Sequence, residues 1–211
     1  MKKFELTDET KTLHNGTVLH RIKALVRIES NAGNVEVGDI GGWIEKEENL
    51  SHYGDAWVFG NAEVYGNALV SGNAELFGNA KVSGNALVYG NAWVFGYAEV
   101  FGNARVYGNA RVYGNARVYG NAEVYCDADV FRIEHYLVMG PIGSRNAFTT
   151  FFRTKDRKIK VICGCFFGTI DEFLAKVKLT HGDSKHAKVY QVAVEVALSQ
   201  LEDVERRNNN A

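Results

Sequence analysis

A six-residue repeat runs from Gly54 to Phe131 and constrains the fold of this chain more than any other feature. It reads GDAWVF, GNAEVY, GNALVS and so on to CDADVF, in thirteen copies without an insertion. Each copy has an alanine and, two positions later, an aliphatic residue, such as Ala62 and Val64. Residues two apart in a strand point to the same side, so we expect both to face inward. The Gly-Asn pair that follows tolerates the positive φ of a sharp corner. Each copy therefore predicts a short strand followed by a corner.

The spacing of charged residues indicates how many copies form one coil. Six residues are too few to enclose a core, but three strands and three corners can do so, which gives eighteen residues per coil. A step of eighteen places Glu63 beside Lys81, and opposite charges on neighbouring strands stabilise a sheet. A step of six would instead place Arg105, Arg111 and Arg117 in one repulsive row. The sequence therefore predicts a three-sided parallel β-helix.

The stretch V-Y-G-N-A-R resembles the hexapeptide-repeat pattern, in which an aliphatic residue and small residues recur at fixed positions. Proteins of that family form left-handed parallel β-helices. The resemblance covers residues 54–131 and implies a left-handed coil, whereas the general rule for parallel crossovers would give a right-handed one. One departure is an aromatic residue where the family often has glycine. The fold class that we expect is mainly β: a left-handed parallel β-helix of 18-residue coils with a small C-terminal α+β module.

Residues 1–53 are expected to form N-terminal strands and a cap for the β-helix. Their first part alternates loosely between apolar and polar residues, which predicts one or two strands. A degenerate first coil follows, in which Ile40 lies eighteen residues before Val58. Ile44 and Leu50 would then occupy the inward small positions. A cap is needed because an open coil end exposes core and unpaired backbone groups.

The period is lost after the repeat, and the pattern changes to a different kind of module. Residues 132–143 contain Gly-Pro-Ile-Gly and are predicted to be a linker. Residues 144–211 are predicted to form a ββαα module, with strands at Ala147–Arg153 and Lys158–Phe166. Two helices with apolar faces follow, and the first opens with a capping box at Thr169.

Composition excludes several classes of partner. The chain has 211 residues, 46% of them hydrophobic, and a net charge of −1, so no overall charge attracts it to nucleic acid or to an anionic membrane. No apolar segment follows the N-terminal lysines, and we expect no export signal and no membrane span. Three cysteines are too few for a disulfide framework, which favours a reducing cytoplasm.

Three parts of the chain together resemble a group of small proteins carried by bacteriophages and prophages. These parts are GDIGGWIEKEENLS, CGCFFGTIDEFLAKVKLTHG and the GNA repeat, and proteins of this group are often described only as hexapeptide-repeat or polymer-forming. The resemblance implies a viral protein that acts in the cytoplasm of a bacterial host. It transfers no active residues to this sequence.

The eighteen-residue step gathers aromatic side chains on one flat face of the predicted β-helix. Monomers rarely expose an apolar surface of that size, and interfaces favour aromatic residues. We therefore expect this face to assemble a homo-oligomer, a dimer or trimer, or to bind a partner. The alternative is burial under a terminal segment of the same chain. The predicted interface residues are Trp57, Phe59, Phe77, Trp93, Phe95, Tyr113 and Phe131.

A second candidate site is a group of basic residues after the repeat. Such a group is usually a solvated turn, but it is the best local candidate for an anionic ligand or partner, such as a nucleotide signal. The residues are Lys155, Arg157, Lys158, Lys160, His181 and Lys185.

The candidates for catalysis are weaker than those for binding. Many hexapeptide β-helix proteins are acyltransferases that use acetyl-CoA and a catalytic histidine, but the repeat here has no histidine and no inserted loop. His52 and His135 lie at its two ends, where packing is the ordinary role. Cys163 and Cys165 would point to one side of a strand and are expected in the core, because zinc requires more ligands than they provide. No catalytic, metal or cofactor residue is therefore assigned.

The function that these observations favour is non-catalytic. The hypothesis is an oligomeric β-helix scaffold that binds a bacterial host protein or sequesters a small anionic ligand, and so inhibits a defence system. One alternative is a hexapeptide-repeat acyltransferase, and another is a structural protein that forms filaments. Binding of nucleic acid is disfavoured, because the eighteen-residue step places the three arginines of one coil on different faces.

Overall fold

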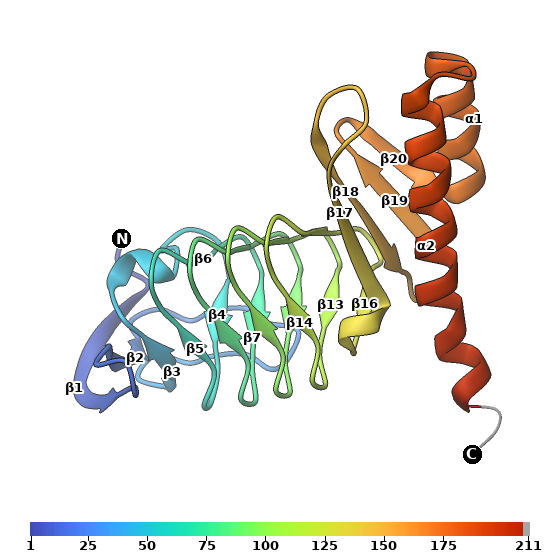
Figure 1. The fold of residues 1–211 in the computed structure, drawn as a ribbon. Helices are drawn as coiled ribbons and strands as arrows, with labels where there is room; N and C mark the ends of the chain where they lie inside the picture. Colours follow the sequence, from blue (N-terminus) through green and yellow to red (C-terminus); the bar gives the residue numbers. More distant parts are fainter. Residues whose placement is uncertain (209–211) are drawn as a thin grey trace. The chain divides into compact units, whose positions relative to one another are not determined.

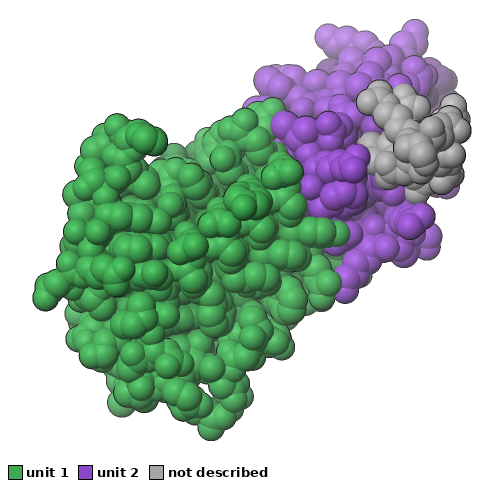
Figure 2. Space-filling view, turned by 90° about the horizontal axis from the view of Figure 1, so that it is seen from below, with its two compact units in different colours: residues 1–127 green, residues 128–211 purple. Residues whose placement is uncertain are grey.

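The repeat folds into a parallel β-solenoid whose short strands stack coil upon coil (Figure 1). The computed structural model describes the backbone of residues 1–208 and the side chains of residues 1–201. The chain divides into a first unit, residues 1–127, and a second unit, residues 128–211 (Figure 2). The solenoid strands of the first unit are β4 Trp57–Val58, β5 Glu63–Val64, β6 Leu69–Val70, β7 Glu75–Leu76, β8 Lys81–Val82, β9 Leu87–Val88, β10 Trp93–Val94, β11 Glu99–Val100, β12 Arg105–Val106, β13 Arg111–Val112, β14 Arg117–Val118 and β15 Glu123–Val124.

The eighteen-residue coil predicted from the charges is confirmed by the pairing of these strands. In β10, for example, Trp93 lies opposite Glu75 on one side and Arg111 on the other. Three parallel rows result within the first unit: β4-β7-β10-β13, β5-β8-β11-β14 and β6-β9-β12-β15, here called the first, second and third faces. The predicted inward alanines and aliphatic residues of residues 56–124 are each at most 1% exposed. The left-handed sense of the coil, which rests on the resemblance, stays a prediction.

The corner glycines are required for two separate reasons. Those from Gly54 to Gly120 have φ between +57° and +72°, a region that other residues adopt only with strain. Most of them also lie directly against the corner of the next coil. A methyl group at Gly90 would come within 2.9 Å of the backbone nitrogen of Gly108. Asparagines beside these glycines form ladders, as where Asn67 donates to Asn85 at 3.2 Å.

The N-terminal cap consists of three strands and a 3-10 helix: β1 Phe4–Thr12, β2 Val18–Ala24, β3 Ile40–Ile44 and the helix Glu47–Asn49. The strands β1, β2 and β3 are antiparallel neighbours, and β3 continues into the second face by parallel pairing with β5. The predicted N-terminal strands and cap are thus confirmed, but their register differs. Ile40 is 54% exposed, while Ile44 lies opposite Val64 and Leu50 opposite Val70, a step of twenty residues.

Three side chains of the cap pair with backbone carbonyls of the first coil that the backbone of the cap does not reach. Lys3 donates to the carbonyls of Gly54 and Ala56 at 3.1 and 2.7 Å. Arg21 donates to Gly60 at 2.7 Å. Asn49 donates to Gly66 and Ala68 at 3.1 and 2.8 Å. Unpaired buried carbonyls are costly, so these side chains close the end of the solenoid.

The second unit is an antiparallel sheet with two helices. Its elements are β16 Asp129–Val130, a 3-10 helix Ile133–His135, β17 Tyr136–Ile142, β18 Ala147–Arg153, β19 Ile159–Cys163, β20 Phe166–Thr169, α1 Ile170–His181 and α2 Lys185–Asn208. The strands β17 to β20 pair in sequence order. Aromatic and aliphatic residues of both helices pack on this sheet, among them Phe173 of α1 and Tyr190 of α2, which share a core with Phe151 of β18.

Two predictions for this region require correction. Residues 132–143, expected as a linker, hold the 3-10 helix and β17, so glycine and proline there did not interrupt the strand. The predicted second strand is two strands, because a turn at Gly164 reverses the chain, and the module is ββββαα instead of ββαα. The capping box is confirmed: Thr169 accepts from the backbone nitrogen of Glu172 at 3.3 Å, and the Glu172 carboxylate accepts from that of Thr169 at 2.7 Å.

The two roles of the corner glycines can be separated by substitution. Gly60→Ala introduces only strain at positive φ, since nothing lies within 4 Å of its new methyl group, and should destabilise by about 1–2 kcal/mol. Gly90→Ala adds a clash with the next coil and should cost a further 1–3 kcal/mol or so. Urea unfolding of both variants measures the difference. Equal losses would show that the close approach of the corners is unimportant.

Burial of Lys3 predicts a pH-dependent stability. Burial lowers the pKa of its amine from 10.5 to about 8, and the charge of Asp55 offsets part of this. Between these values the unfolded chain holds a proton that the folded chain has released, so stability should rise with pH, by at most about 1.4 kcal/mol per pH unit. Unfolding of the wild type and of Lys3→Met measures this contribution as their difference. A difference that stays constant from pH 7 to 10 would contradict it.

Candidate binding surface

Aromatic rings stack along the first face of the solenoid. Phe77, Phe95 and Tyr113 occupy the same outward position on successive coils, and their ring centroids are 4.8 Å apart at each step. This spacing follows from the distance between hydrogen-bonded strands, which brings equivalent side chains of successive coils into face-to-face contact. Trp93 lies beside the stack, with its ring edge-on to Phe77 at 5.7 Å and to Phe95 at 6.5 Å. We call Phe77, Trp93, Phe95 and Tyr113 the aromatic wall.

The aromatic wall also contacts a positively charged side chain, Arg111. The guanidinium of Arg111 lies 4.9 Å from the ring centroid of Trp93, a cation–π contact. All four rings of the wall remain partly exposed. A flat, partly exposed aromatic surface with an arginine is typical of protein interfaces.

The N-terminal cap covers the beginning of the first face. Trp57 is only 1% exposed, and its ring packs edge-on against Phe4 at 6.4 Å. Glu75, the next residue in the same row, is also 1% exposed and accepts a hydrogen bond from the backbone nitrogen of Asn31 at 2.8 Å. The prediction that Trp57 contributes to an interface is therefore wrong, because a segment of the same chain buries it. Phe59 remains partly exposed.

Phe131, the last residue of the predicted row, belongs to the second unit. There its ring makes an edge contact with His135, with 4.1 Å between the ring centroids. We therefore do not include it in the aromatic wall.

Tyr97 is an exposed aromatic residue that the sequence analysis missed. It is 68% exposed and stands at a corner, two residues after Phe95. Its repeat reads GYAEVF, so tyrosine replaces the asparagine found in the neighbouring copies. That single departure from the repeat was a signal. Because Tyr97 is exposed at an asparagine position, it extends the apolar surface at the edge of the aromatic wall.

Three of the predicted pairs of outward charges are confirmed. On the second face, Glu63 lies 3.8 Å from Lys81, and Arg117 donates to Glu99 at 2.8 Å. On the third face, Arg105 lies 3.7 Å from Glu123. These pairs neutralise both faces, and the arginines do not form a basic stripe.

The predicted basic cluster is not one site. Lys155, Arg157, Lys158 and Lys160 lie on or beside the hairpin between β18 and β19. Lys160 lies opposite Thr169 in the sheet, and Thr169 directly precedes the first residue of α1. His181 is the last residue of that helix of twelve residues, about 18 Å long, and Lys185 begins α2. The helix therefore separates the two groups, and the prediction of a single anion site is wrong.

Both histidines at the ends of the repeat take part in packing. His52 stacks on Phe4 at 4.4 Å and accepts a hydrogen bond from the backbone nitrogen of Lys3 at 3.1 Å. His135 is 2% exposed, and burial, together with the nearby charge of Arg153, lowers its pKa.

The cysteines differ from expectation in part. Cys163 is partly buried, but Cys165 is exposed because it lies in the turn between β19 and β20, so the core prediction is wrong for Cys165. All three cysteines are free thiols. Within the described residues, no group of three or more histidine, cysteine or acidic side chains could hold a metal ion. No helix of that part of the chain is long and apolar enough to cross a membrane.

The fold and the surface define a β-solenoid repeat protein with an aromatic face. The chain is similar to the family described as the YdcK beta solenoid repeat, whose model matches residues 78–96, 98–113 and 110–125. These segments all lie in the solenoid, and the match supports the prediction of a β-helix repeat. No curated protein matches the chain.

Proposed function

We propose that this chain is a non-catalytic binding and assembly protein whose solenoid associates with further copies of itself through the aromatic wall. The observation that carries the proposal is the partly exposed stack of Phe77, Phe95 and Tyr113 on a flat face. Two such faces related by a twofold axis can bury their rings against each other. The other two faces also carry stacked rings, such as Phe101 on Tyr119 and Tyr89 on Tyr107. They differ from the first face in their paired charges, which remain hydrated at little cost.

The solution mass of the full chain tests this proposal. The wild type should be a dimer or trimer, and Phe77→Glu/Phe95→Glu should be a monomer, because charges would be buried in the interface. Tyr89→Glu/Tyr107→Glu is the matched control, since these rings stack in the same way, at 4.7 Å, but on the third face. Light scattering measures the mass, and circular dichroism checks that each variant is folded.

Three outcomes would contradict the proposal. A monomeric wild type would show that the wall does not assemble copies of this chain. Equal dissociation of both double variants would show that no particular face is responsible. Indefinite polymers of the wild type would support the alternative of a structural filament.

The biological role that we propose is interference with a process of a bacterial host, as part of a phage or prophage. It is supported by the resemblance of the cap, the repeat and the α1 segment to small phage-carried proteins. The assembled scaffold would act in the host cytoplasm, where it occupies a host protein or sequesters a small anionic molecule and so blocks a defence system. In this role the protein acts by binding alone.

Phage plating efficiency on a bacterium with an active defence system tests that role. The wild-type chain should restore plating, and Phe77→Glu/Phe95→Glu should not, while Tyr89→Glu/Tyr107→Glu should behave as the wild type. Plating that remains restricted with all three proteins, across several classes of defence system, would remove the support for this role.

The alternative of an acyltransferase makes a different prediction. It requires turnover of acetyl-CoA that is lost in His52→Ala or His135→Ala. The contacts of both histidines favour a packing role, because His52 is held between Phe4 and the backbone of Lys3 and His135 is almost completely buried. Turnover that depends on either residue would overturn the non-catalytic proposal.

A further inference from the structure

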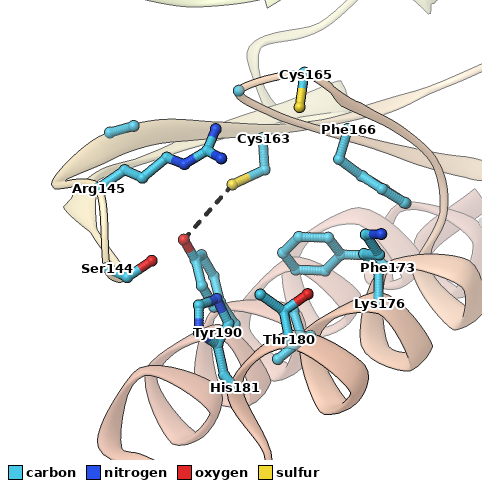
Figure 3. Close-up of a pocket in the computed structure, with 13 residues that line it drawn as sticks. Ser144, Arg145, Cys163, Cys165, Phe166, Phe173, Lys176, Thr180, His181 and Tyr190 are labelled. Carbon is cyan, nitrogen blue, oxygen red and sulfur yellow. Dashed lines mark hydrogen bonds between the residues drawn. The ribbon is translucent and has the colours of Figure 1, made fainter.

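The second unit contains a cavity of about 200 Å³ that the sequence did not indicate (Figure 3). It lies between the β17–β18 loop, the β19–β20 turn and the facing sides of α1 and α2. Arg145 and Ser144 come from the loop, Cys163 and Phe166 from the turn and its flanks, and Tyr190 from α2. The cavity is therefore built from segments that are far apart in the sequence.

Backbone geometry in the loop and the turn keeps the cavity open. Gly143 has φ of +72°, and a methyl group there would overlap the hydroxyl of Tyr190. Without that methyl group, the hydroxyl of Tyr190 can accept a hydrogen bond from the thiol of Cys163, with 3.8 Å between Sγ and the hydroxyl oxygen. Gly164, at φ of +60°, lies beside the guanidinium of Arg145, which would be 3.5 Å from an added methyl group. The loop thus directs Arg145 over the contact between Cys163 and Tyr190 (Figure 3).

The lining combines positive charge with an apolar floor. Arg145, Lys176 and His181 line the cavity, and its described lining residues include no aspartate or glutamate. Among the residues that the structure describes, Lys158 pairs with Asp156 and Lys178 with Asp183, whereas neither Arg145 nor Lys176 forms a salt bridge. An unpaired guanidinium beside a cavity is a strong donor for a carboxylate or a phosphate.

The apolar part of the cavity is aromatic. The ring of Phe173 lies 5.3 Å from that of Phe166 and 5.4 Å from that of Tyr190, and it meets Tyr190 edge-on. Val177 completes this side. Phe173 and Tyr190 are already buried, whereas Phe166 is partly exposed. A flat organic group in the cavity would cover Phe166 and gain hydrophobic free energy, which a single inorganic phosphate would not.

We propose that this cavity binds a small organic acid, with its carboxylate or phosphate on Arg145 and its flat apolar body against Phe166 and Phe173. The hydroxyl of Tyr190 supplies a neutral hydrogen-bond donor beside the anion, and Lys176 adds positive charge. The inference deepens the proposed binding of a small anion by giving it a site and a ligand class. It does not depend on assembly through the aromatic wall.

Binding of four probes to the full chain tests the proposal. Phenyl phosphate and benzoate carry both required features, inorganic phosphate carries only the anion, and benzyl alcohol carries only the ring. Calorimetry and NMR shifts of Arg145 and Tyr190 should show binding of phenyl phosphate or benzoate, at least about tenfold tighter than either single-feature probe. The comparison of phenyl phosphate with benzoate identifies the preferred head group.

Substitutions separate this cavity from the other basic residues. Arg145 is exposed, so Arg145→Gln should fold normally and weaken binding about 10- to 100-fold. Lys155→Gln, at the β18–β19 hairpin, is the matched control and should leave binding unchanged. Gly143→Ala should displace Tyr190 and weaken binding as well, with circular dichroism as the check of folding.

Several results would overturn the inference. They are the absence of binding of both phenyl phosphate and benzoate at millimolar concentration, equal affinity for inorganic phosphate, or an equal loss in Lys155→Gln and Arg145→Gln. The same titration with Phe77→Glu/Phe95→Glu keeps the two proposals apart. Ligand binding by a monomeric variant supports the cavity whatever the oligomeric state, and an oligomer that binds no probe refutes the cavity alone.

Discussion

Stacking of one coil on the next, at the spacing of hydrogen-bonded strands, is the constraint on which the first unit depends. It fixes the corner glycines, because Gly90 lies too close to Gly108 for any side chain. It also makes every outward position a row, so that equivalent residues of successive coils touch. Phe77, Phe95 and Tyr113 form the aromatic wall for this reason, and the asparagine ladders form in the same way. The surface is thus a direct consequence of the core geometry.

This periodicity explains why so much of the first unit could be predicted from the sequence. Strands, corners, inward residues and charge pairs all follow from one local rule that recurs every six residues. The cap has no such six-residue repeat. Its register of twenty residues, with Ile40 exposed, arises between Leu50 and Val58, which are eight residues apart where the repeat would have six. The burial of Trp57 depends on Phe4, more than fifty positions away, and no spacing within the repeat could reveal it.

The second unit was predicted less well because its contacts are not periodic. Its helices were found from apolar spacing and from the capping box at Thr169, which are local signals. The strand β17 was missed because Gly140 and Pro141 interrupt its pattern. Residues of the cavity, such as Arg145 and Tyr190, come from separate segments. The prediction of one basic site was wrong for the opposite reason. Its residues are close in the sequence but lie at opposite ends of α1.

The cap also bears on how copies of this chain can associate. A β-solenoid can extend into a filament only where a coil end offers unpaired backbone groups. At the N-terminal end, Lys3, Arg21 and Asn49 already pair with the carbonyls of the first coil. The strand β1 lies at the outer edge of its sheet, but it is antiparallel to β2 and cannot continue the parallel coil. Growth by end-to-end stacking at this end is therefore disfavoured, and the flat first face, which carries the aromatic wall, remains the surface suited to a closed oligomer.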